Sequence, residues 1–417
     1  MPSSGSPASS PYPSTLIYLD NNATTQPAEQ VVEAVAQAMR TRWANPSSIH
    51  RAGQDARHAV ELARASVAAL IGANPKNITF TSGGTESIDL AVRGVLSTPS
   101  THSPPQPTPV RVVSTRIEHA AVRELLVSLE KQGAVTLGFL DTDGWGCVKA
   151  ESLEREITPG TRLVSVQWAN NETGTVQEIG AIAARCRAVG AVFHCDGTQW
   201  VGKNDTDVGE VSGSPPPCDI LTFSAHKWHG PKGVGIVWAR PGVRLPPRIH
   251  GTQEKGRRGG TENAEGIIGA GVAAQLAAGW LADAAGRERG RELCDRFNTR
   301  VFAGLGDMQL RDNTVAAAGA APCPARLWNT TNIGFHRLEA EALLMAFSEQ
   351  GLCASAGAAC SSGSLDPSPV LLAMGVPAEF AHGSVRFSLS RYSTREEIDR
   401  AAEIVIACVR KVRRSMA

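Results

Sequence analysis

A lysine and a cysteine in unlike sequence contexts are the first candidates for chemistry. Lys227 follows the uncharged run Ile220–Phe223, which is typical of a buried strand. This spacing places an amine nucleophile at the carboxyl end of a strand, where open α/β sheets build their sites. Cys360 lies within a run of small residues, 356–364, which packs little against a core and which we expect to be mobile. A lysine able to form a Schiff base and a thiol able to move indicate carbonyl chemistry on a sulfur-containing substrate.

A glycine-rich turn is a candidate phosphate site. The segment Phe80–Ser87 follows a predicted strand and leads into the apolar helical stretch Ile88–Leu96, with Gly84 and Thr85 at the junction. Free backbone N–H groups and hydroxyls converge at such a junction and suit a phosphate. The alternative is a plain Gly-Gly turn capped by Thr85.

Three further polar positions follow predicted strands. Asp196 ends the strand Ala191–Cys195, where its carboxylate would need a cation such as a protonated ring nitrogen, or would cap the next turn. His119 follows the strand Arg111–Thr115 and either stacks on a ring, carries protons or is a structural histidine. Asn171 either binds a carboxylate or phenolic oxygen or belongs to an Asx turn. Together with the lysine and the phosphate site, these are the contacts that pyridoxal 5'-phosphate requires.

The composition excludes some classes of function. The chain has 41 Lys and Arg against 40 Asp and Glu, so broad electrostatic binding to nucleic acid or to a membrane is not expected. Its 9 cysteines include no Cys-x-x-Cys pair, which favours reduced thiols in a cytoplasm and no bound metal. The uncharged run Gly266–Leu281 is shorter than the roughly 20 residues of a membrane span and predicts a packed helix.

The order of the elements predicts an α/β fold. Short β-rich runs alternate with helix-length segments, which is typical of a mostly parallel sheet covered by helices. The runs are Asn77–Thr81, Arg111–Thr115, Arg162–Gln167, Ala191–Cys195, Ile220–Phe223 and Gly233–Trp238. Residues 1–15 are rich in Ser and Pro and are expected to be a disordered leader, not a signal peptide. Residues 16–284 are expected to form the large domain, with their first residues packing on a smaller α+β domain of residues 285–417.

These motifs resemble a known family. The segments Ile17–Thr25, Asn45–His50 and Arg386–Tyr392 are similar to those of cysteine desulfurases of the NifS and IscS type, which are class V aminotransferases of pyridoxal phosphate fold type I. The segments Trp168–Thr175 and Gly256–Ala264 resemble the nitrogen-fixation branch most. The resemblance covers nearly the whole chain and implies a seven-stranded sheet in the large domain.

The resemblance also implies roles for individual residues. Lys227 would hold the cofactor as a Schiff base, Asp196 would pair with its ring nitrogen, and His119 would stack on the ring. Cys360 would be the nucleophile, preferred over Cys353, and Lys232 would be the less suitable lysine. Gln199 and Asn171 would contact the phenolic oxygen of the cofactor, and its phosphate would be bound by Gly84, Thr85, Ser224 and His226. Thr261 would bind the phosphate in the partner subunit. The substrate carboxylate would be bound by Arg386 and Asn45.

The implied reaction converts L-cysteine to L-alanine and leaves a persulfide on Cys360. The family further implies a homodimer and a sulfur-acceptor protein such as an iron–sulfur scaffold. Three alternatives remain at this point: an aminotransferase or selenocysteine lyase of the same fold, a scaffold for sulfur transfer that has lost its cofactor, and a cysteine hydrolase without cofactor. The sequence does not name the acceptor, and it gives the two Pro-rich stretches, 97–109 and 213–218, no role beyond surface loops.

Overall fold

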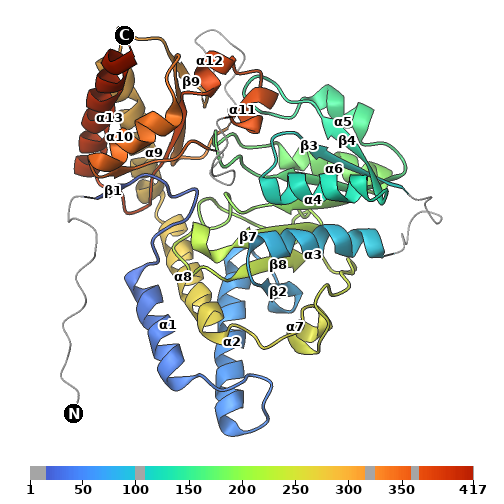
Figure 1. Ribbon diagram of the computed structural model, residues 1–417. Coiled ribbons are helices and arrows are strands. Elements are labelled where there is room, and N and C mark those ends of the chain that lie inside the picture. The colour runs from blue at the N-terminus through green and yellow to red at the C-terminus, as the bar shows by residue number, and fades with distance from the viewer. Residues whose placement is uncertain (1–15, 99–108, 315–324, 358–365, 417) are drawn as a thin grey trace, which may run out of the picture.

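A seven-stranded sheet forms the centre of the molecule (Figure 1). The computed structural model describes residues 16–98, 109–314, 325–357 and 366–416. The strand order is β2-β8-β7-β6-β5-β3-β4, and only β8 runs antiparallel to its neighbours. The strands are β2 (Ile78–Thr81), β3 (Val110–Thr115), β4 (Val135–Leu140), β5 (Thr161–Gln167), β6 (Val192–Asp196), β7 (Ile220–Ser224) and β8 (Gly235–Ala239). The predicted mostly parallel sheet is confirmed.

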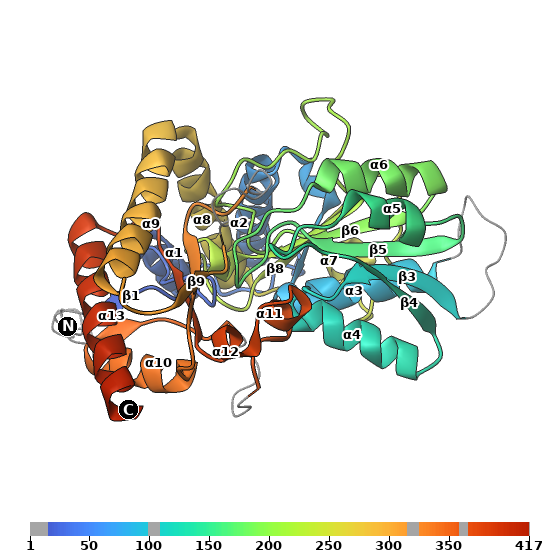
Figure 2. The same ribbon diagram turned by 90° about the horizontal axis from the view of Figure 1, so that it is seen from above.

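Helices cover both faces of this sheet, so that successive residues of one strand enter different cores. Val112 packs with α3 (Gly84–Ser97) and α4 (Ala120–Lys131), whereas Val113 belongs to the core that includes α2 (Arg51–Leu70) and α6 (Ile179–Val189). Figure 2 shows α3 and α4 on one side of β3 and β5, and α6 with α5 (Ala150–Glu156) on the other. Burial on both faces explains why these strands are continuous apolar runs.

Strand β4 is the one strand of this sheet that the sequence did not predict. It lies at the sheet edge beside β3, and only three of its six residues, Val135, Gly138 and Leu140, are buried. Gly138 interrupts its apolar pattern because the guanidinium of Arg111 lies over it, 2.7 Å from where a Cβ would be. A half-exposed edge strand with an internal glycine has only a weak pattern.

The predicted apolar helix is a buried core helix, α8 (Ala264–Ala282). By length and composition alone it would pass as a membrane span. It packs instead against α1 (Glu29–Thr41) and α2, and Gly271 permits the close approach because a Cβ there would lie 2.6 Å from Ala63. The interpretation of this segment as a packed helix is confirmed.

A second core lies around a three-stranded antiparallel sheet. Strand β10 (Thr330–Phe335) lies between β9 (Leu310–Asp312) and β12 (Ser384–Ser388). Strand β1 (Ile17–Tyr18) pairs with β11 (Leu352–Cys353), so the N-terminal segment packs with this C-terminal core. The long helices of this core are α9 (Ala284–Gly304), α10 (Ala340–Glu349) and α13 (Arg395–Met416). The remaining short helices lie in different parts of the chain: η1 (Pro75–Asn77), η2 (Ala225–Lys227), α7 (Gln253–Gly256), α11 (Pro369–Ala373) and α12 (Ala378–Ala381). The domain division at residue 284 stays a prediction, and residues 1–15 lie outside the described residues.

A buried ion pair fixes the segment that leads from β8 to α8. Arg64 Nη2 lies 2.7 Å from Glu254 Oε1, and both side chains are almost fully buried. Glu254 also accepts a hydrogen bond from the Phe80 N–H at 2.8 Å, which ties the segment to β2.

We predict that Arg64→Met lowers the free energy of unfolding by about 3–5 kcal/mol, because it leaves the Glu254 carboxylate buried without its cation. Denaturant titration of the purified protein measures this loss. The matched control is Arg40→Met, since the pair of Arg40 with Glu33 is solvent-exposed, and it is expected to cost less than about 1 kcal/mol. Equal losses for the two variants would contradict the prediction.

Candidate active site

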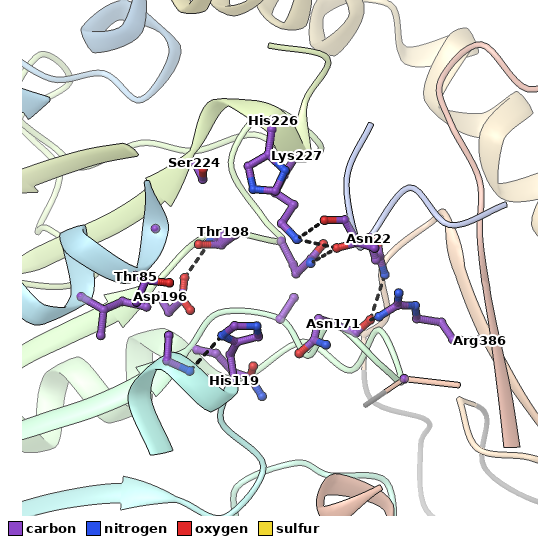
Figure 3. Close-up of a pocket in the computed structure, with 18 residues that line it drawn as sticks. Asn22, Thr85, His119, Asn171, Asp196, Thr198, Ser224, His226, Lys227 and Arg386 are labelled. Atoms are coloured by element: carbon purple, nitrogen blue, oxygen red, sulfur yellow. Dashed lines mark hydrogen bonds between the residues drawn. The ribbon is translucent and has the colours of Figure 1, made fainter. Parts of the chain in front are cut away.

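A cavity of about 280 Å³ lies where β5, β6 and β7 end and α3 and α4 begin. Residues from both cores line it (Figure 3). The predicted site residues that it brings together are Gly84, Thr85, His119, Asn171, Asp196, Gln199, Ser224, His226, Lys227 and Arg386. Most of them follow a strand of the central sheet, which explains why residues far apart in the sequence meet here.

Lys227 is the amine of this cavity. It is the last residue of η2, which directly follows β7. Its Nζ donates hydrogen bonds to the backbone carbonyls of Asn22 at 2.7 Å and Ala23 at 2.8 Å. Two neutral backbone oxygens therefore hold the amine at the cavity wall.

Asp196 and His119 lie on the opposite side of the cavity from Lys227 (Figure 3). Asp196 is the last residue of β6 and is 6% exposed, and its Oδ1 accepts a hydrogen bond from the Thr198 N–H at 3.0 Å. This carboxylate thus both caps the following turn and faces the cavity, so the two alternatives for it are compatible.

His119 is the N-cap of α4 and is held in one tautomer. Its Nδ1 accepts a hydrogen bond from the Ala121 N–H at 3.1 Å, which leaves the ring hydrogen on Nε2 in the neutral imidazole. Burial lowers the pKa of His119, and the charge of Lys227 adds to this effect while that of Asp196 opposes it. His119 thus presents a neutral ring to the cavity.

Neutral donors gather at the start of α3. The N-cap residue Gly83 provides no side-chain hydrogen bond to this helix, so its first N–H groups face the cavity end without a side-chain cap. A Cβ on Gly84 would lie 3.7 Å from both Ser224 Cβ and Thr198 Oγ1. The absent side chain leaves a space framed by two hydroxyls and a helix N-terminus, which suits a phosphate.

Arg386 reaches the cavity from the second core. It lies on β12 and is 2% exposed. Its Nη2 lies 2.6 Å from Asp20 Oδ1, and its Nη1 donates to the backbone carbonyl of Asn171 at 3.0 Å. Its buried Nε has no partner within the described residues. A guanidinium in this position can bind a carboxylate in the cavity.

The segment after β5 contains two asparagines, and one forms an Asx turn while the other lines the cavity. Asn170 is fully buried, and its Oδ1 accepts hydrogen bonds from the N–H groups of Glu172 and Thr173, which makes it the Asx turn. Asn171 lines the cavity.

Some predicted residues do not reach this cavity. Asn45 is exposed and its Oδ1 accepts a hydrogen bond from the Ser47 N–H at 2.8 Å, and Thr261 is also exposed. Neither lines the cavity, so neither meets a ligand there within one chain. Cys360 lies outside the described residues, but Gly357, three positions earlier, lines the cavity.

Sequence reasoning missed several residues that also line the cavity, among them Thr198 and Asn22. Thr198 lies two positions after Asp196, and a hydroxyl just beyond a strand-terminal carboxylate was the signal available for it. Asn22 belongs to a motif that the sequence analysis noted without giving it a role, and it acts through its backbone carbonyl.

Three of the described cysteines, among them the rival in the sequence, are poor nucleophiles. Burial raises the pKa of Cys186 and of Cys294 to about 12, and it also raises the pKa of Cys353, the rival in the sequence. Cys353 is in addition part of strand β11. A thiolate is the reactive form, so these thiols are unsuited to attack.

The comparisons with known proteins agree with this geometry. Residues 17–401 match the model of the aminotransferase class-V family. A cysteine desulfurase of Trichormus azollae is 42% identical over 400 residues, which are 96% of this chain and 94% of that protein. The chain belongs to the aminotransferase class-V family and, within it, to the cysteine desulfurase group.

Solved structures share the fold along most of the chain. A NifS-like protein is 32% identical with a TM-score of 0.82, covering 95% of this chain and 100% of that one. SspA in complex with cysteine is 29% identical with a TM-score of 0.72, covering 90% of this chain and 99% of that one.

The histidines on either side of Lys227 predict a pH dependence of stability. Burial lowers the pKa of both His226 and His229 to about 4, with nearby positive charges acting in the same direction. In the unfolded chain a histidine has a pKa of about 6.5. The unfolded state therefore binds more protons between these values, and stability is full above about pH 6.5 and falls as the pH drops toward 4.

We predict that each of these two histidines contributes about 1.4 kcal/mol per pH unit to that loss. Denaturant titrations between pH 7 and pH 5 measure the slope. His229→Gln is expected to reduce it by about that amount, and an unchanged slope would show that the folded protein protonates His229 freely.

Proposed function

We propose that this protein is a cysteine desulfurase that uses pyridoxal 5'-phosphate to convert L-cysteine to L-alanine. The observation that carries the proposal is the meeting of Lys227, Asp196, His119 and the start of α3 around one cavity. The cysteine desulfurase relatives and the likeness to SspA in complex with cysteine support the substrate.

The donor set fits the cofactor. The frame of Gly84, Thr198 and Ser224 suits the phosphate, and Thr85 and His226 line the cavity beside it. The Asp196 carboxylate would hold the ring nitrogen in its protonated form, and the flat ring of His119 would stack on the cofactor. When bound, the cofactor supplies an electron sink that makes the α-proton of an amino acid removable.

The residues of this chain then have separate tasks. Lys227 would hold the cofactor as a Schiff base and, once released, its amine would accept the α-proton of the substrate. Arg386 would bind the substrate carboxylate with its planar guanidinium, and the nearby Asn171 and Gln199 would supply neutral polar groups for the carboxylate and the phenolic oxygen. His119, with its hydrogen on Nε2, would donate a hydrogen bond to a thiolate in the cavity and so stabilise the charged form of the thiol.

Cys360 is the proposed sulfur acceptor within the chain. Three residues of chain span at most about 10 Å, so a residue three positions after Gly357 can reach the cavity that Gly357 lines. The carbon–sulfur bond of L-cysteine would break as a sulfur–sulfur bond forms with the Cys360 thiolate, giving L-alanine and a persulfide. A thiol of a sulfur-acceptor protein, such as an iron–sulfur scaffold, would then take the sulfur.

The assay is L-alanine and sulfide formation from L-cysteine with dithiothreitol as the sulfur-accepting thiol. Cys360→Ser and Lys227→Ala are each expected to lower the rate at least about 100-fold, because each removes a group that forms a bond during the reaction. Cys353→Ser is the matched control and is expected to keep the activity, since that thiol is held in β11. Mass spectrometry after addition of L-cysteine should find one added sulfur on Cys360.

Other outcomes would point to the alternatives. Full transamination in Cys360→Ser would indicate an aminotransferase, and a preference for selenocysteine that survives this substitution would indicate a selenocysteine lyase. A purified protein that binds no pyridoxal phosphate would be a scaffold for sulfur transfer. An added sulfur on Cys353 would contradict the assignment of the nucleophile.

We further propose that the protein acts in the cytoplasm as a homodimer. Large apolar side chains are exposed on α1, α2 and the segment between them, where Met39, Trp43, Ile49 and Leu62 are 60%, 77%, 91% and 57% exposed. Such a surface is typical of an interface. A partner subunit there also offers a role for the exposed Thr261 and Asn45.

We predict that Ile49→Asp raises the dimer dissociation constant at least about tenfold, because a charge would be buried in the interface. Analytical ultracentrifugation measures it. Met345→Asp is the control, since Met345 is 73% exposed on α10 of the other core. Equal effects of both variants would contradict an interface at Ile49.

A further inference from the structure

Lys203 is a buried lysine to which the proposed reaction gives no task. It is 5% exposed and lies four positions after Gln199. The turn that aims it inward is sterically fixed: Gly202 has a φ of +76°, and a Cβ there would lie 2.7 Å from Trp228. The Lys203 carbonyl accepts a hydrogen bond from Trp328 Nε1 at 3.0 Å, which ties the turn to the second core.

The amine of Lys203 contacts amide oxygens, not a carboxylate. Its Nζ donates to Gln199 Oε1 at 2.6 Å and to Asn22 Oδ1 at 2.8 Å. Burial lowers the pKa of Lys203 well below its usual range, and the charges of Lys227 and Arg386 act in the same direction. The two amide oxygens accept two hydrogens of this amine.

These contacts fix the orientation of both amides. At the other end of Gln199, Nε2 donates to the backbone carbonyl of Asn22 at 2.9 Å, and that carbonyl can only accept. Asn22 Nδ2 likewise donates to the carbonyl of Asn171 at 3.1 Å. The donor and acceptor ends of each amide are therefore assigned by partners on both sides.

The same Asn22 carbonyl holds the amine of Lys227. It accepts from Gln199 Nε2 and from Lys227 Nζ at once. Lys203 thus holds the side chains of Gln199 and Asn22, and the backbone carbonyl of Asn22 is the anchor of the Lys227 amine. The second Nε2 hydrogen of Gln199 is left for a ligand in the cavity that Gln199 lines.

We propose that Lys203 is a positioning residue: by locking the amides of Gln199 and Asn22, it aims the Gln199 N–H at the phenolic oxygen of the cofactor and fixes the anchor of Lys227. This inference rests on the proposed function. A donor at the phenolic oxygen stabilises its anionic form and thereby weakens its hold on the proton of the neighbouring Schiff-base nitrogen.

The other charged and titratable groups around Lys227 are all retained in a Lys203 variant. They are Asp196 on β6, His119 at the start of α4, His226 in η2, Lys232 before β8, and Arg386 on β12 with its partner Asp20. A change in the titration of the Schiff base therefore reports on Lys203 and on the amides that it holds.

The test is a pH titration of the visible absorbance of the holoenzyme. We expect Lys203→Met to raise the midpoint by about one pH unit, the shift expected when one hydrogen bond to a charged group is lost. Gln199→Leu should give a similar rise, and the double variant should shift no further than either single variant, because Lys203 acts through Gln199. Lys232→Met is the control: Lys232 is exposed, so solvent screens the loss of its charge and the midpoint should stay within about 0.3 unit.

Lys203→Gln keeps a donor at the buried position and carries no charge. It is expected to fold and to titrate within about 0.3 unit of the wild type, since hydrogen bonds to the two amides can re-form. A full shift in Lys203→Gln would overturn the positioning role even if Lys203→Met does not fold. Additive shifts in the double variant, or no shift in a folded Lys203→Met, would also overturn it. A wild-type protein without the visible band would instead contradict the proposed function.

Discussion

The site depends on one short segment, residues 20–25, that is bonded to both cores. Its carbonyls at Asn22 and Ala23 hold the Lys227 amine, and the Thr25 N–H donates to the carbonyl of His226 at 2.9 Å. On the other side, the Asn22 N–H donates to Ser388 Oγ at 2.9 Å, on strand β12. Because Arg386 lies on the same strand, the amine and the guanidinium are placed relative to each other by this segment.

The charges of the cavity follow from this arrangement. Arg386, paired to Asp20, reaches the cavity from the second core, while Asp196 lies across the cavity from Lys227 (Figure 3). The phosphate end is framed by hydroxyls and backbone N–H groups, which bind an anion without a buried counter-charge. His119 and His226 are kept neutral by burial. An anionic cofactor and an amino acid with a free carboxylate both fit such a distribution.

The sequence predicted the parts of the site that have a local signal. Asp196 and Lys227 follow apolar strands, and the carboxyl ends of neighbouring parallel strands meet at one edge of a sheet, so their proximity was predictable. The start of α13 also has a local signal: Thr394 lies three positions before Glu397, and each side chain accepts a hydrogen bond from the other residue's N–H as a capping box.

What the sequence could not predict arises from contacts between distant segments. Asn22 lies 205 positions from Lys227 in the chain. Its contact uses the backbone carbonyl, which every residue type has, so the sequence carries no signal for it. The placement of Asn45 outside the cavity is of the same kind, because it depends on how the segment before α2 packs. Strand β4 was not predicted because its exposure at the sheet edge and the glycine at position 138 weaken its apolar pattern.

The central claim is that the amine at position 227 carries the cofactor. Reduction of the holoenzyme with borohydride makes a Schiff base permanent, and peptide mass spectrometry then identifies the modified lysine. The account predicts the pyridoxyl group on Lys227 and an unmodified Lys203 and Lys232. A pyridoxyl group on either of those two lysines, with Lys227 unmodified, would contradict it.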